Sequence, residues 1–197
     1  SRGLGDVYKR QAMAQRRPNL RTVILNVYGG ESLNHPDITE ILAEVRQRYQ
    51  PYAQRWTLKI TTTTNAIVSR QRMEKIIPLI DEFTVSYHTN NTKKQKDLFK
   101  ANILSIQSAG RSVKCVILMH SEPELFEDAQ QQIAWCEQHG IKHLPRQLDR
   151  AFTQTDFNYA PQQVHWFRDL YTARSHNAVC DLEPVGEETN LTKQGRA

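Results

Sequence analysis

Glycines and polar side chains follow two neighbouring apolar segments of the chain, where each segment ends. Gly29, Gly30 and Glu31 follow the first segment, and the second ends in a run of threonines closed by Thr64 and Asn65. Glycines leave backbone amides open to the close approach of a ligand, and Glu31 adds an acceptor for a cationic group. A Gly-Gly turn before a helix is also ordinary loop chemistry, so this pattern alone leaves both interpretations open.

Polar residues also stand at the ends of the three apolar segments that follow. Ser86, Tyr87 and His88 end the third segment, His120 follows the fourth, and Arg146 lies in the fifth. A sheet that only packs against helices does not need polar groups at five strand ends. Because the C-terminal ends of parallel strands form the functional edge of α/β proteins, the sequence predicts a polar, ligand-holding mouth at that edge.

Strands and helices must alternate to position these residues. Apolar β-branched runs predict strands that are buried on both faces, and apolar residues with a helical period predict the helices between them. We expect strands at residues 22–27, 57–62, 82–87, 113–119 and 141–148, and helices at 35–49, 69–80, 93–109, 126–139 and 161–175. Units of roughly 26 to 35 residues with right-handed crossovers make either a doubly wound sheet or part of a barrel.

The first expected helix has a clear pattern. Pro36 suits the first helical position. One apolar stripe on this helix is formed by Ile38, Ile41, Leu42, Val45 and Tyr49. The stripe predicts the side of the helix that packs against the sheet.

Composition restricts the class of protein. The chain has 197 residues, of which 39% are hydrophobic and 24% charged, as in a globular domain with a core. The net charge of +5 is spread along the chain, so nucleic acid is not an expected partner. No apolar run approaches about 18 residues, which excludes a transmembrane helix. The three cysteines lack a CxxC spacing and predict neither a disulfide framework nor a zinc site, so a reduced, cytoplasmic setting is expected.

The two ends of the chain differ from its centre. Residues 1–11 have no apolar period and no initiator methionine, and we interpret them as an adaptor or linker scar, with a native N-terminal arm as the alternative. We expect residues 12–150 to form the core and residues 151–197 to hold a C-terminal helix and the start of a truncated extension. The chain is thus expected to be a fragment that is open at both ends.

Two motifs resemble those of a known family. GGESLNHPDI, at residues 29–38, resembles the GGEP motif and following helix start of radical S-adenosylmethionine (radical SAM) enzymes. TTTTNA, at residues 61–66, resembles the TNG-type end of the next strand in that family. The resemblance covers residues 20–149. It implies an α/β fold, a partial (β/α)6 TIM-like barrel of parallel strands that is incomplete at the N-terminus.

The resemblance also implies roles for the residues at the strand ends. Gly29, Gly30 and Glu31 would hold the amino group of the methionine part of S-adenosylmethionine (SAM). Ser32 stands where the family motif has proline. Thr64 and Asn65 would lie near this cofactor.

Further roles are implied for the later strands. Ser86 would contact the ribose or the carboxylate of SAM, and Lys114, His120 or Arg146 would be additional contacts. Arg146 suits a bidentate pair with a carboxylate, although an ordinary surface ion pair is the alternative. The expected substrate contacts are Tyr87, His88 and His120.

The family's CxxxCxxC motif, which binds a 4Fe-4S cluster, is absent from the sequence. We expect it upstream of Gly29, beyond the start of this chain; a relative without a cluster is the alternative. Cys115 and Cys136 have the pattern of core thiols. Cys180, beyond the last expected helix, is a candidate ligand of an auxiliary cluster whose other cysteines would follow Ala197.

The resemblance implies reductive cleavage of SAM at the cluster, which gives a 5'-deoxyadenosyl radical that abstracts hydrogen from a substrate the sequence does not name. An electron donor such as a flavodoxin or ferredoxin is implied, and this fragment is expected to be inactive alone. Two alternatives remain. One is a non-catalytic, barrel-derived protein that binds nucleic acid or protein, with basic residues at 46–48 and 93–96 and with Trp166 and Tyr171 as stacking residues. The other is a metal-dependent hydrolase that uses His88 and His120 as ligands.

Overall fold

The computed structural model describes residues 21–148 and 158–180, with the side chains of residues 173–180 excepted. The expected scar at residues 1–11, the expected boundary at residue 150 and the segment after Cys180 lie outside these residues. Within the described residues, no helix combines the length and the apolar character that crossing a membrane requires.

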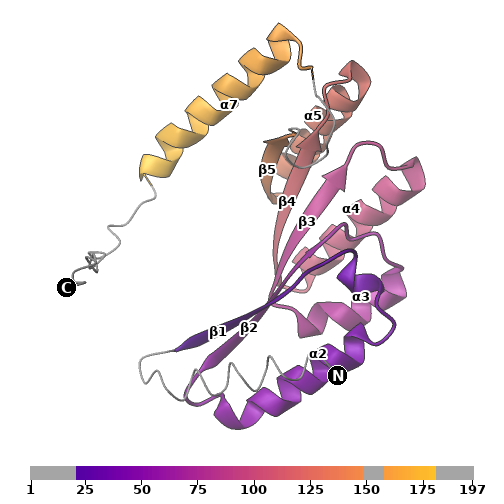
Figure 1. Ribbon diagram of the computed structural model, residues 1–197, viewed down its shortest axis with the longest axis vertical. Coiled ribbons are helices and arrows are strands. Elements are labelled where there is room, and N and C mark those ends of the chain that lie inside the picture. Colours follow the sequence, from indigo (N-terminus) through magenta and orange to yellow (C-terminus); the bar gives the residue numbers. More distant parts are fainter. Residues whose placement is uncertain (1–20, 149–157, 181–197) are drawn as a thin grey trace, which may run out of the picture.

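Five parallel strands form one sheet in the sequential order β1-β2-β3-β4-β5. The strands are β1 (Thr22–Val27), β2 (Thr57–Thr64), β3 (Glu82–His88), β4 (Ser112–Met119) and β5 (Lys142–Gln147). A doubly wound sheet reverses its strand order at a switch point, whereas this order does not reverse. The fold is therefore the expected α/β partial TIM-like barrel, and the described strands form an open, strongly twisted sheet (Figure 1).

Helices connect the strands. They are α2 (Ile38–Tyr49), α3 (Arg70–Ile76), α4 (Lys93–Ser108), α5 (Pro123–Gln138) and, after β5, α7 (Pro161–Cys180). Single 3-10 turns are η1 (Ser32–Asn34), η2 (Gln50–Tyr52) and η3 (Ile77–Leu79). Helices α2 to α5 lie along one side of the sheet (Figure 1), as right-handed crossovers require.

The sheet has two chemically different faces, because successive strand residues point to opposite sides. The helix face packs against α2 to α5 and is apolar; its fully buried residues include Ile60, Val85, Cys115, Ile117 and Met119. The opposite face, called the inner face below, is polar and partly exposed. It carries Thr63, Thr84, Ser86, His88, Lys114, Val116, Leu118, Lys142, Leu144 and Arg146.

The first helix differs from its expected form. Helix α2 begins at Ile38 after the N-cap Asp37, so Pro36 precedes the helix and is not its first residue. Ile41 is 45% exposed and does not belong to the buried stripe. Because α2 packs against the sheet on one side only, its buried stripe is narrower than the apolar stripe in the sequence. Helix α5 begins earlier than expected, at Pro123, because proline is pre-organised for a first helical turn.

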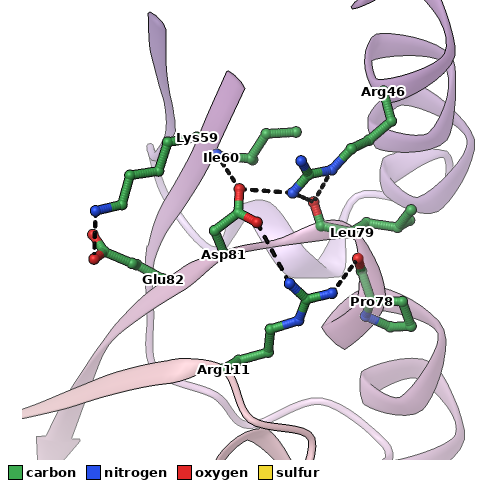
Figure 2. Close-up of polar contacts among 8 residues, drawn as sticks. All are labelled: Arg46, Lys59, Ile60, Pro78, Leu79, Asp81, Glu82 and Arg111. Carbon is green, nitrogen blue, oxygen red and sulfur yellow. Dashed lines mark hydrogen bonds and ion pairs between the residues drawn. The ribbon is translucent and has the colours of Figure 1, made fainter. Parts of the chain in front are cut away.

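One carboxylate joins several elements at the N-terminal edge of the sheet (Figure 2). Asp81, which precedes β3, accepts hydrogen bonds from the backbone N–H of Ile60 and from Nη2 of Arg46, both at 2.7 Å. Nη1 of Arg111 lies 3.5 Å from the other carboxylate oxygen. The network therefore connects β2, α2 and the start of β4 through residues far apart in sequence.

The two arginines also satisfy carbonyl groups that the 3-10 turn η3 leaves without partners. Arg46 donates to the carbonyl oxygen of Leu79 from Nε at 3.2 Å and from Nη2 at 3.0 Å. Arg111 donates to the carbonyl oxygen of Pro78 at 2.9 Å. A helix end needs such partners because its last carbonyls have none within the helix.

Candidate functional site

Glu31 lies where β1 and β2 end, and its carboxylate is held from both sides. The Thr64 hydroxyl donates to Oε1, and the backbone N–H of Asn65 donates to Oε2 at 2.8 Å. The side chain is half-buried, and no cationic side chain of the described residues forms an ion pair with it. A fixed carboxylate without a cation beside it is a good acceptor for a ligand ammonium group.

The two glycines before Glu31 leave room for a ligand. Gly29 has φ +117° and Gly30 has φ +47°, conformations that side-chain-bearing residues rarely adopt. A Cβ atom built on either glycine would meet no atom within 4 Å. Both residues are exposed, so their backbone is open to close approach, as the motif predicts.

Helix α4 holds the loop that presents Asn65. The fully buried Asn102 donates from Nδ2 to the carbonyl oxygens of Ala66 at 2.8 Å and Val68 at 2.9 Å. Ala66 has φ +54°, a strained conformation that persists only where the surroundings enforce it. The backbone N–H of Ala66 also donates to the Thr64 hydroxyl at 2.9 Å. Sequence reasoning missed Asn102; its one signal is a polar residue inside the apolar stripe of α4.

Two imidazoles, His88 and His120, follow on the next strands, and His88 interacts electrostatically with both Glu31 and His120. His88 ends β3 on the inner face, and His120 follows β4. Burial lowers the pKa of His88 from its ordinary value of 6.5, the charge of His120 lowers it further, and the Glu31 carboxylate acts in the opposite direction. Nδ1 of His120 is 3.6 Å from Oε2 of Glu122. His88 is therefore a neutral imidazole at pH 7 that is close enough to sense both Glu31 and His120.

We expect His88 to make the stability of the fold sensitive to pH. Because its folded-state pKa is lowered, the unfolded chain binds a proton that the folded chain does not, between that pKa and 6.5. Stability is then fully present above this interval and falls as the pH drops through it. Urea unfolding at about pH 7.5 and about pH 5.5 measures the effect. The His88→Gln variant should lose less stability between these values than the unmodified chain, and equal losses would contradict the assignment.

Tyr87 lies on the other face of the sheet from Ser86 and His88. Its ring packs edge-on against Phe99 of α4, and its hydroxyl is 3.0 Å from Oδ2 of Asp128 on α5. Burial raises the pKa of Tyr87, and Asp128 raises it further. The expected substrate contact at Tyr87 is thus corrected: Tyr87 alternates with the inner-face residues and belongs to the core.

A Tyr87→Phe variant tests this placement. The buried hydroxyl donates to Asp128, which also pairs with Lys96 at 2.9 Å. We expect its removal to lower the free energy of unfolding by about 1 kcal/mol. Ligand binding at the strand ends should not change. Urea unfolding and a ligand titration on the same sample check both statements, and weakened ligand binding at unchanged stability would show that the hydroxyl serves the site.

The other residues that were expected to contact SAM lie on the inner face, at different positions along and across the strands. Ser86 precedes His88 by two residues on this face. Arg146 is paired in register with Leu118, the partner of His88, and so lies two strands away, about 10 Å. Lys114 is paired with Thr84, one step below Ser86. The structure therefore brings Thr64 and Asn65 against Glu31 and places His88 within electrostatic range of Glu31 and His120. It spreads the others over the sheet.

The structure bears on the expected roles of the cysteines and on the alternative of a metal site at His88 and His120. Cys115 on β4 and Cys136 on α5 are buried free thiols, which confirms them as core residues. The expectation that Cys180 lies beyond the last helix is wrong, because α7 continues to Cys180; the side chain of Cys180 lies outside the described residues. Among the described residues, no group of three or more His, Cys, Asp or Glu side chains could hold a metal ion. Among the described residues, His88 and His120 therefore have no third side chain with which to bind a metal ion.

A cavity of about 450 Å³ lies at the opposite edge of the sheet, beside α2 and the start of β2. Its lining includes Arg46, Tyr49, Trp56, Thr57 and Leu58. It contains none of the strand-end residues described above. The candidate site rests on the chemistry of those residues, and this cavity does not contribute to it.

The fold is similar to solved structures of SuiB from Streptococcus suis. SuiB bound to S-adenosylmethionine matches with a TM-score of 0.52 and 15% identity, covering 81% of this chain and 37% of the SuiB chain. SuiB bound to the precursor peptide SuiA matches with a TM-score of 0.51 and 16% identity, covering 78% and 36% of the respective chains. This chain thus spans little more than a third of SuiB. The likeness shows a shared fold.

Other comparisons give no match. No protein-family model matches the sequence, and no curated protein matches it either.

Proposed function

We propose that this chain is part of a radical SAM enzyme and binds SAM at the C-terminal edge of its sheet. The Glu31 carboxylate carries the proposal. It is fixed by Thr64 and Asn65, has no cation of the described residues beside it, and follows two exposed glycines. The methionine part of SAM has an ammonium group that such a carboxylate would accept. SuiB, which shares the fold, was solved with SAM bound.

The other strand-end residues have supporting roles in this proposal. Gly29 and Gly30 place backbone against the methionine part. Asn102 holds the loop that fixes Glu31, and so acts on the ligand through Asn65. Ser86 contacts the ribose or the carboxylate, and Arg146 is a more distant contact for a carboxylate.

The proposal includes a 4Fe-4S cluster whose ligands lie outside the described residues, because these contain no suitable group of side chains. The cluster would supply the electron, received from a donor such as a flavodoxin or ferredoxin, for the reductive cleavage of SAM to a hydrogen-abstracting radical. The residues of this chain bind and orient SAM, and we derive no step through the cluster. The neutral His88 lies beside the bound ligand as an acceptor for a substrate hydrogen bond.

Isothermal titration of SAM into the 197-residue chain tests the binding part of the proposal. We expect one binding site and a much weaker response to 5'-methylthioadenosine, because that compound lacks the amino acid part that Glu31 recognises. Equal binding of both compounds would show that Glu31 is not the anchor. An absence of SAM binding would overturn the proposal.

The coding sequence upstream of this chain tests the cluster part. A CxxxCxxC motif some tens of residues before Gly29 is the expected result. A start codon with no cysteine triplet between it and Gly29 would contradict the cluster, and would favour a barrel-derived binding protein that uses the same edge for its ligand.

A further inference from the structure

Two lysines face each other on the inner face, below the proposed SAM site. Lys114 of β4 and Lys142 of β5 are paired in register, so their side chains share a face. Both residues are exposed. Thr84 of β3 and Thr63 of β2 continue the same row across the sheet. Four adjacent strands thus present two ammonium groups and two hydroxyls at one level.

The described residues do not neutralise these two lysines. No carboxylate of the described residues forms an ion pair with Lys114 or Lys142. Lys59 on β2 shows the contrast, because its Nζ lies 2.6 Å from Oε1 of Glu82 on the neighbouring strand (Figure 2). Like charges directly opposite each other on a sheet repel, and a bound anion would remove that repulsion.

We propose that Lys114 and Lys142 bind the carboxylates of an acidic peptide, which is the substrate of the proposed SAM site. This inference rests on the proposed function and names its substrate class. SuiB, with the same fold, was solved with a precursor peptide bound. The inner face is the side of the sheet turned away from α2 to α5 (Figure 1), and Lys114 and Lys142 are exposed there to an extended chain.

The distance between the lysine row and the strand ends predicts where the acidic residue of the peptide lies. The lysine row is level with Thr84, two residues before Ser86 and four before His88 on β3. At about 3.3 Å per residue, the row lies roughly 7 to 13 Å below the mouth. An extended peptide has the same rise, so the carboxylate should lie about two to four residues from the position that reacts.

The composition of the face favours a peptide over nucleic acid. Sites for single-stranded nucleic acid combine a positive groove with aromatic side chains on which bases stack. Among the described strands, no inner-face position carries phenylalanine, tyrosine or tryptophan. The hydroxyls of Thr63 and Thr84 instead add hydrogen-bond donors that suit carboxylate oxygens.

Fluorescence anisotropy tests the inference. The probe is a fluorescein-labelled nonapeptide of alternating glycine and glutamate, compared with the same peptide carrying glutamine in place of glutamate. We expect the 197-residue chain to bind the acidic probe and not the neutral one, more weakly at high salt. The Lys114→Gln, Lys142→Gln double variant should bind about tenfold more weakly. The control variant is Lys94→Gln, which changes an exposed residue of α4. This variant should bind the acidic probe like the unmodified chain.

The outcomes separate this inference from the proposed function. Titration of SAM into the double variant should give unmodified affinity. Lys114 was an expected SAM contact, but it is level with Thr84, four residues before the end of β3, and so lies below the SAM site. Loss of acidic-probe binding in the double variant with intact SAM binding supports the inference. Three results would overturn it while leaving SAM binding untouched: no acidic-probe binding, equal loss in Lys94→Gln, or tighter binding of a fluorescein-labelled single-stranded DNA of matched charge. Absent SAM binding with lysine-dependent peptide binding would count against the proposed function alone.

Discussion

The Glu31→Gln variant is expected to bind SAM about tenfold to a hundredfold more weakly than the unmodified chain. A hydrogen bond to a charged partner contributes roughly 1.5–3 kcal/mol, which corresponds to this range of affinity. The amide oxygen of glutamine can still accept from the Thr64 hydroxyl or the Asn65 N–H, which now hold the carboxylate. The change therefore removes the charge and preserves most of the local structure. Isothermal titration measures the affinity.

Glu40→Gln is the matched control, because Glu40 is an exposed carboxylate in the first turn of α2. Its affinity for SAM should equal that of the unmodified chain. The two variants should also have the same circular dichroism spectrum. Equal SAM affinity in both variants would remove Glu31 from the site.

The Asp81→Ala variant is expected to lose about 2–3 kcal/mol of the free energy of unfolding. The change leaves the backbone N–H of the fully buried Ile60 without its partner, and separates the guanidinium groups of Arg46 and Arg111 from their shared carboxylate. Breaking a buried pair costs about 3–5 kcal/mol, but the side chain of Asp81 is 26% exposed. Solvent screening reduces the electrostatic part.

Urea unfolding measures this loss, and Asp97→Ala provides the control. Asp97 pairs with Lys93 within α4, where the two side chains are 61% and 89% exposed. Such pairs contribute about 0.3–0.5 kcal/mol. A loss for Asp81→Ala as small as that for Asp97→Ala would show that the network at the N-terminal edge does not hold the elements together.

The order of elements could be predicted from the sequence because each strand and helix carries its own period. The strand-end position of Glu31, Thr64 and Asn65 followed from that order alone, since parallel strands all end at one edge. Their hydrogen bonds to each other could not be predicted, because they depend on how two loops pack. Asn102 fixes one of those loops from α4, 36 residues away from Ala66 in sequence.

The prediction that Tyr87 contacts the substrate could have been corrected from the sequence alone. Phe83, Val85 and Tyr87 alternate with polar residues along β3, and all three lie on the helix face. Because side chains alternate between the two faces of a sheet, this pattern places Tyr87 on the apolar helix face. It does not place Tyr87 among the ligand-binding residues at the strand ends. The Asp81 network has no comparable signal, because single charges in loops have no periodicity and meet only through tertiary structure.

The most direct test of the proposed SAM site is an NMR titration of SAM into the 15N-labelled chain. We expect the backbone amide signals of Gly29, Gly30 and Asn65 to shift on SAM addition, and those of Asp81 and Arg111 at the opposite edge to stay unchanged. Shifts confined to the opposite edge, around the cavity beside Tyr49 and Trp56, would contradict the proposed site. The absence of any shift would contradict the proposed function itself.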